Sequence, residues 1–230
     1  MKTRRHMRKR VDDLPIPLGD DDEMDDLYIA IPSEELRSRG FYYITGEIGD
    51  EVLEVIHQDI FLKHLDSNWK DPLTLIINSP GGTTAACWSL VDLMDYVRMP
   101  IHTVGMGSIC SAGAILFAAG EKGHRLLSPN CELMVHLPYE IIRNLKVDVA
   151  DLTSLSSAHK KEYQRHVRFW LDHSNLSDEE DLQQALLKKA DTYLTAEEAI
   201  ELGIADAILT SHKQPPREEK PKKRNRKKKV

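Results

Sequence analysis

Two serines lie in a run of small residues that continues into an apolar, helix-like stretch. The run covers residues 105–120, reads GMGSICSAGAILFAAG, and contains Ser108 and Ser111. A serine hydroxyl becomes an effective nucleophile only when a base takes its proton and nearby donors stabilise the resulting oxyanion. Small residues also allow close backbone packing, so the run by itself favours a structural role for both serines.

Ser111 has the surroundings that a nucleophile needs. It precedes AGAILFAAG and would stand at a helix N-terminus, where free N–H groups favour negative charge. Ala112 and the Gly81-Gly82 turn can supply backbone donors to an acyl oxyanion. His136 ends an apolar segment and is the candidate base, and Asp191 is the candidate that orients the imidazole. Ten histidines allow many accidental triads, so these signals alone do not choose among them.

The elements that must position these residues alternate between strand and helix patterns. Near-continuous apolar runs that end at Gly or Pro are typical of buried parallel strands, and apolar residues at helical spacing follow each run. This alternation predicts an α/β protein with parallel pairing. Strands are expected at 41–48, 72–82, 101–107, 124–129, 132–138, 192–194 and 205–209, with helices at 50–65, 84–98 and after Ser111.

The second half of the chain has a different, more helical character. Residues 149–172 carry apolar side chains such as Trp170 along one side and charges elsewhere, which predicts a long amphipathic helix. Two capping-box patterns, Ser177 with Glu180 and Thr195 with Glu198, are each expected to open a further helix.

Several segments together resemble the proteolytic subunit of the Clp protease family. They are NSPGG at 78–82, SAGAILFAAGEKGHRLLSPN at 111–130, LMVHLP at 133–138 and DTYLTAEEAIELGIADAIL at 191–209. Their residue types are similar to the motifs of that family. The spacing between the glycine pair, Ser111 and His136 is similar as well. The resemblance implies a crotonase-like α/β fold, a spiral of strand-strand-helix units, in which residues 149–172 match the long handle helix.

The resemblance also implies a serine endopeptidase site. Ser111 would be the nucleophile, His136 the base and Asp191 the residue that holds the imidazole. The backbone N–H groups of Gly82 and Ala112 would form the oxyanion hole, and Ser108 is left as a packing residue. No metal and no cofactor are required. The family implies polypeptide substrates, two stacked seven-membered rings and an AAA+ ATPase that unfolds and feeds the substrate.

Departures from the family keep other functions open. Thr74 and Ile76 stand where the family has aromatic residues of its ATPase-docking pocket, although Tyr96 keeps one ring. A viral head-maturation protease of the Clp type, which cleaves scaffold or capsid proteins without ATP, is one alternative. A crotonase-like acyl-CoA enzyme or a catalytically inactive ring subunit are others, because a fold does not determine a function.

Charge divides the chain into three parts. Residues 1–26 form a charged N-terminal arm, with six basic residues followed by eight acidic ones, and residues 27–210 form the predicted peptidase domain. Residues 211–230 are a basic tail with almost no apolar side chains, which predicts disorder. A basic tail can bind nucleic acid. Because the rest of the chain is acidic, a solubilising or protein-contacting tail is preferred over a nucleic-acid partner.

Cysteine usage and hydropathy indicate a cytoplasmic protein. The chain has three cysteines, without CxxC or Cys/His ligand spacing, which argues against a disulfide framework or a structural zinc. No apolar run approaches the roughly 18 residues that a membrane span needs, and no signal-peptide pattern follows the basic start. We therefore expect a cytoplasmic protein that does not enter a membrane.

Overall fold

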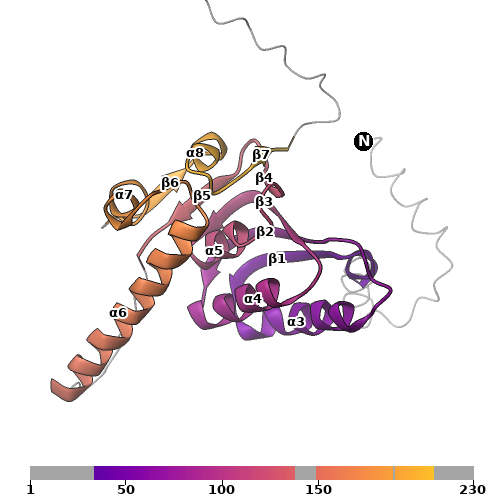
Figure 1. Ribbon diagram of the computed structural model, residues 1–230, viewed down its shortest axis with the longest axis horizontal. Helices are drawn as coiled ribbons and strands as arrows, with labels where there is room; N and C mark the ends of the chain where they lie inside the picture. Colours follow the sequence, from indigo (N-terminus) through magenta and orange to yellow (C-terminus); the bar gives the residue numbers. More distant parts are fainter. Residues whose placement is uncertain (1–33, 138–148, 189, 210–230) are drawn as a thin grey trace, which may run out of the picture. The chain divides into compact units, whose positions relative to one another are not determined.

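Three long parallel strands form one end of a seven-stranded sheet (Figure 1). They are β1 (Phe41–Ile48), β2 (Leu73–Gly82) and β3 (Ile101–Cys110), which lie in the order β1-β2-β3. Every second residue of β2 from Leu73 to Ile77 is fully buried. Apolar side chains at this period bury one face of the sheet, and the predicted parallel α/β arrangement is confirmed.

β3 divides between two neighbours. Its first half pairs in parallel with β4 (Arg125–Leu127), and its second half pairs in parallel with β5 (Glu132–Val135). β4 also pairs in parallel with β7 (Ala207–Ile208), whereas β5 pairs with β6 (Thr192–Leu194) in the antiparallel direction. Because of this fork, the chain that leaves β5 emerges beside the end of β3.

One helix follows each of the three long strands. They are α3 (Asp50–Leu65), α4 (Thr84–Tyr96) and α5 (Ala112–Ala118). α3 and α4 lie next to each other on the same side of the sheet (Figure 1). Every residue of α5 is buried, so this short helix is part of the core that packs on β2 and β3.

The predicted long helix is α6 (Val149–Asp172). Its C-terminal half is attached to α4, because Trp88 Nε1 donates to Glu162 Oε1 at 2.8 Å and the rings of Trp88 and Phe169 meet edge to face at 5.4 Å. The opposite end of α6 projects away from the sheet (Figure 1). α6 therefore has the form of the handle that the family resemblance implies.

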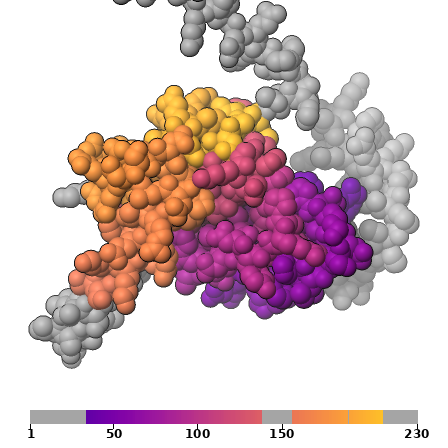
Figure 2. Space-filling model, in the orientation of Figure 1, coloured from indigo at the N-terminus to yellow at the C-terminus, as the bar shows by residue number. Residues whose placement is uncertain are grey.

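Two short helices complete the described fold. They are α7 (Glu179–Ala185), which packs beside α6, and α8 (Ala196–Glu201), which contacts β5, β6 and β7. The C-terminal part of the described chain, in yellow, adjoins the orange region that contains α6 and α7 (Figure 2). Thr195 caps α8 through a complete capping box with Glu198, as predicted. The prediction for Ser177 is wrong. α7 begins one residue later, because the side chain of Asp178 accepts the N–H of Asp181.

A buried ion pair ties β4 to the segment before β7. The guanidinium of Arg125 donates to both carboxylate oxygens of Asp206, at 2.7 and 3.0 Å, and the same carboxylate accepts the backbone N–H of Gly123. Arg125 also donates to the carbonyls of His173 and Gly203. The pair thus joins the edge of the sheet to the end of α6.

These features come from a computed structural model that describes residues 34–137, 149–188 and 190–209. Residues up to Arg39 form one unit, in which residues 34–38 are helical, and residues from Gly40 form the other. The predicted charged arm at 1–26 and the predicted tail at 211–230 lie outside the described residues. The three-part division of the chain remains an expectation.

Candidate active site

Ser111 occupies a strained turn between β3 and α5. Its φ of 54° and ψ of −120° make it the one non-glycine residue with positive φ in the described part of the chain. Its N–H donates to the carbonyl of Met134 on β5 at 2.8 Å, and its own carbonyl accepts the N–H groups of Ala114 and Ile115. Backbone strain of this kind persists only where the surrounding structure fixes it, and it concentrates at functional sites.

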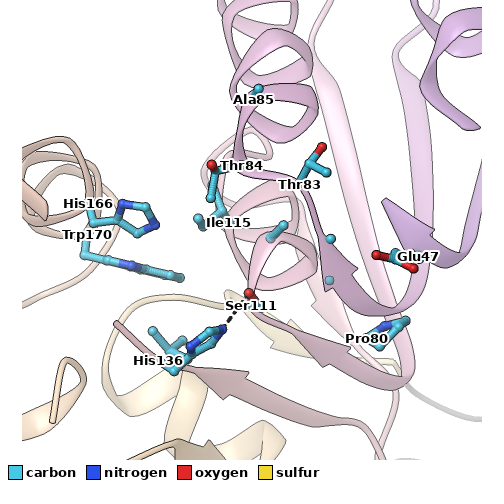
Figure 3. A pocket seen from close by; sticks show the side chains of 14 residues that line it. Glu47, Pro80, Thr83, Thr84, Ala85, Ser111, Ile115, His136, His166 and Trp170 are labelled. Atoms are coloured by element: carbon cyan, nitrogen blue, oxygen red, sulfur yellow. Dashed lines mark hydrogen bonds between the residues drawn. The ribbon is translucent and has the colours of Figure 1, made fainter. Parts of the chain in front are cut away.

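His136 lies against the hydroxyl of Ser111. It follows β5 directly, and its Nε2 is 2.7 Å from Ser111 Oγ (Figure 3). The two side chains meet because Cys110 and Met134 are paired across β3 and β5, so that Ser111, one residue after Cys110, and His136, two residues after Met134, lie at the same edge of the sheet. An imidazole at this distance is placed to accept the hydroxyl proton, which is the geometry of a nucleophile and its base.

Gly81 and Gly82 bring the end of β2 close to the serine. A Cβ on Gly81 would lie 2.7 Å from Ser111 Cβ and 3.2 Å from the Ala112 nitrogen, so a side chain does not fit there. A Cβ on Gly82 would collide with the main chain of Ile48. Ala112 is the first residue of α5, and its N–H has no acceptor within the helix. Gly82 and Ala112 both line the pocket at Ser111.

Asp191 is the neighbour of His136 in the register of the sheet. Thr192 of β6 pairs with Val135 of β5 in antiparallel register. Asp191 precedes Thr192 and His136 follows Val135, so these two residues come next to the pair at the same end. The side chain of Asp191 is exposed. The structure therefore brings Ser111, His136, Gly82 and Ala112 together, whereas the role of Asp191 stays a prediction.

Ser108 lies outside this arrangement. Its hydroxyl is 3.1 Å from the thiol of Cys110, and it is not among the residues that line the pocket. Cys110 is half-buried, and the other two cysteines, Cys87 and Cys131, are buried and free. Burial raises the pKa of the Cys131 thiol to about 11, with smaller contributions from Cys110 and Glu132, so this thiol stays protonated.

A pocket of about 680 Å³ opens in front of Ser111. The turn from β2 into α4 forms one side of it, and α6 forms the other through His166 and Trp170 (Figure 3). Glu47, at the end of β1, also lines it. A volume in this range accommodates a peptide side chain or a small ligand.

Two pocket residues from α6 were missed or given another role by sequence reasoning. Trp170 was recognised only as part of an apolar helix face, and His166 was not singled out. His166 is 3% exposed, and its Nδ1 lies 3.0 Å from the carbonyl oxygen of Glu162. Burial is the main cause that lowers the pKa of His166 below its usual range, which favours the neutral imidazole. The i, i+4 spacing of a histidine and a tryptophan on one helix was the available signal.

Other site types are not indicated by the described residues. In residues 34–137, 149–188 and 190–209, no group of three or more His, Cys, Asp or Glu side chains is arranged to hold a metal ion. Nor does this part of the chain contain a helix that is long and apolar enough to cross a membrane.

A comparison with protein families finds a match over most of the chain. The family model described as Clp protease matches residues 26–212, which is most of the chain and includes every residue discussed at the pocket.

Proposed function

From the premise that this chain belongs to the Clp protease family, we propose that it is a serine endopeptidase whose nucleophile is Ser111. The observation that carries the proposal is the 2.7 Å contact between Ser111 Oγ and His136 Nε2 at a strained strand-to-helix turn. The family makes the chain a Clp-type peptidase. The serine mechanism and the roles of individual residues are what we propose.

The proposed reaction begins with proton transfer from Ser111 to His136. As the hydroxyl oxygen attacks a substrate carbonyl, His136 Nε2 takes the proton and then delivers it to the leaving amine nitrogen. The acyl group remains on Ser111 as an ester. A water molecule, deprotonated by His136, then attacks the ester. As the acyl–oxygen bond breaks, His136 returns the proton to Ser111 Oγ, and the carboxylic acid product leaves.

The oxyanion of each tetrahedral intermediate needs donors that are already in position. The N–H of Ala112 is free of an intrahelical acceptor, and the Gly82 backbone lines the same pocket. Donors held by a helix start and a glycine turn do not reorganise during the reaction, which makes them effective. We assign these two N–H groups to the oxyanion hole.

Asp191 is proposed to hold the imidazole through Nδ1. Its position one residue beyond the Val135–Thr192 pair makes it the neighbour of His136 across β5 and β6. A carboxylate there would fix the tautomer of His136 and stabilise the imidazolium that forms during attack.

Ring assembly is proposed on the basis of exposed apolar side chains and the family. α3 buries Leu53, Ile56 and Ile60 but exposes apolar side chains on its other faces. A soluble chain seldom exposes so many large apolar residues on one helix, unless another surface covers them. These residues are Val52, Val55, Phe61, Leu62 and Leu65. We propose that neighbouring subunits cover them in stacked heptameric rings, which enclose the pockets and admit unfolded polypeptides.

A partner ATPase is proposed for folded substrates. Tyr96 is 65% exposed and stacks on Phe61 at 6.3 Å, so aromatic surface is present beside the apolar residues of α3. Cleavage of a folded protein only in the presence of an AAA+ unfoldase and ATP would support this partner. Cleavage of capsid or scaffold protein without ATP would support the viral alternative instead.

Hydrolysis of a fluorogenic peptide by the full chain tests the proposed function. We expect activity in a species whose native mass corresponds to fourteen chains, and loss of activity on the order of 10⁶-fold in Ser111→Ala. Ser108→Ala is the matched control and retains activity, because the hydroxyl that it removes lies 3.1 Å from Cys110 Sγ and outside the pocket. Equal activity of Ser111→Ala and wild type would refute the assignment.

A further inference from the structure

The side of the pocket formed by α6 carries two polar groups that the proposed mechanism does not use. They belong to His166 and Trp170, which are 3% and 1% exposed and line the same pocket as Ser111 and His136. Residues four apart on a helix lie on one face, about 5–6 Å apart at Cβ. Figure 3 shows both rings projecting from α6 towards the side of Ser111.

His166 presents a hydrogen-bond acceptor to the pocket. Its Nδ1 is 3.0 Å from the carbonyl oxygen of Glu162 and 3.5 Å from Glu162 Oε1, and both of these atoms can only accept. Nδ1 therefore carries the proton. In the neutral ring, which burial favours, Nε2 then has a lone pair. No hydrogen bond to Nε2 is found among the described residues, and the distal side of the ring is directed into the pocket (Figure 3).

Trp170 contributes a donor that lacks an acceptor. Its Nε1–H is buried and has no hydrogen-bond partner within the described part of the chain. Buried tryptophan N–H groups usually have one, since an unsatisfied buried donor lowers stability. The nitrogen itself is buried, so a substrate oxygen would reach it only after a shift of the indole, and side-chain shifts of this kind are common on binding.

We propose that this donor and acceptor select a side-chain carboxamide, so that the protein cleaves polypeptides after glutamine or asparagine. The carbonyl oxygen of the carboxamide would accept from Trp170 Nε1, and its NH₂ would donate to His166 Nε2. This inference rests on the proposed function, because it takes Ser111 as the group that attacks the carbonyl of the selected residue.

Related side chains fit the pair less well. Glutamate has acceptors only, so one carboxylate oxygen would face the lone pair of His166 Nε2. Methionine matches glutamine in length and shape but satisfies neither group. A site that forms hydrogen bonds with its substrate discriminates against analogues that leave its polar groups unpaired. This discrimination is stronger than that of an apolar pocket, which distinguishes substrates by size alone.

Matched fluorogenic peptides that differ only in the residue before the leaving group test the proposal. With the full-length wild-type protein, we expect kcat/KM for the Gln peptide to exceed that for the Met and Glu peptides by about tenfold or more, which corresponds to about 1.4 kcal/mol. In Trp170→Phe and in His166→Phe, the ratio of the Gln to the Met value should fall towards one.

The ratio separates substrate recognition from general damage to the fold. Tyr163→Phe is the control on the same helix, because it removes a hydroxyl that bonds to Glu179 and Gln183 and does not line the pocket. It should keep the wild-type ratio. Equal wild-type cleavage of Gln and Met peptides, or an unchanged ratio in both pocket variants, would overturn the carboxamide proposal while leaving the peptidase intact. Failure to cleave any peptide, with Ser111 unreactive, would overturn the proposed function as well.

Discussion

Ser111 Oγ and His136 Nε2 are 2.7 Å apart although 25 positions separate the two residues in the chain. The contact depends on the fork in β3, whose last residues pair with β5 rather than β4. Ser111 is further held to β5, because its N–H donates to the carbonyl of Met134. The sheet thus fixes the positions of nucleophile and base before any substrate binds.

Asp191→Asn tests whether the carboxylate orients His136. An amide in its place would no longer hold the correct tautomer, so we expect kcat to fall by about 10⁴-fold. The measurement is kcat for a fluorogenic peptide, with Glu197→Gln as a control that changes an exposed carboxylate of α8 and should have little effect. A loss smaller than tenfold for Asp191→Asn would remove this residue from the catalytic set.

Asp206→Ala tests the stability supplied by the buried ion pair. The substitution leaves the guanidinium of Arg125, which is 3% exposed, without its carboxylate. Breaking one partner of a buried pair costs about 3–5 kcal/mol of unfolding free energy. Urea unfolding measures the loss of unfolding free energy. All variants are compared at the same protein concentration, because assembly into oligomers makes the apparent stability depend on concentration. Glu35→Ala, which breaks an exposed pair with Arg39, should cost less than about 1 kcal/mol.

Thr192→Val is expected to stabilise the protein. The Thr192 hydroxyl is buried without a hydrogen-bond partner among the described residues, and removing such a group recovers about 1 kcal/mol. Thr103→Val is the matched control, since that hydroxyl donates to the carbonyl of Phe117 at 2.8 Å and its loss should be destabilising. The two changes in urea midpoint should have opposite signs; a lower midpoint for Thr192→Val contradicts the prediction.

Buried histidines predict lower stability in mild acid. Burial is the largest cause that lowers the pKa of His166 and of His173 from the usual value of about 6.5. The unfolded chain therefore binds these protons at a higher pH than the folded chain, so stability is present above about pH 6.5 and is lost as the pH falls below it. The urea midpoint should be lower at pH 5.5 than at pH 7.5. The difference between the two midpoints should be smaller in His173→Gln than in the wild type. A midpoint that rises on acidification would contradict this account.

Local sequence patterns predicted the strands and helices because each apolar run matches one element. The residues 41–48, 50–65 and 149–172 were expected as β1, α3 and α6, and the structure has the same bounds. The cap of α7 was predicted incorrectly, because both Ser177 and Asp178 can cap and sequence alone did not decide between them.

The composition of the pocket was harder to predict than the fold. Ser111, Ala112 and the glycine turn lie at the ends of elements that the sequence marks clearly. His166 and Trp170 reach the pocket only because α6 packs on α4 through Trp88 and Glu162, a tertiary contact with no local signature. Asp191, in contrast, was expected from the family motif. Its proposed contact with the imidazole of His136 stays a prediction, and the register of β5 and β6 permits it.

Covalent labelling of the assembled protein by a fluorophosphonate tests the central claim most directly. Intact mass and peptide mapping should find one adduct per chain, on Ser111, because the adjacent imidazole activates that hydroxyl. The adduct should be absent in Ser111→Ala and form far more slowly in His136→Ala. An assembled wild-type protein that stays unlabelled, or that is labelled equally well after Ser111→Ala, would contradict the account.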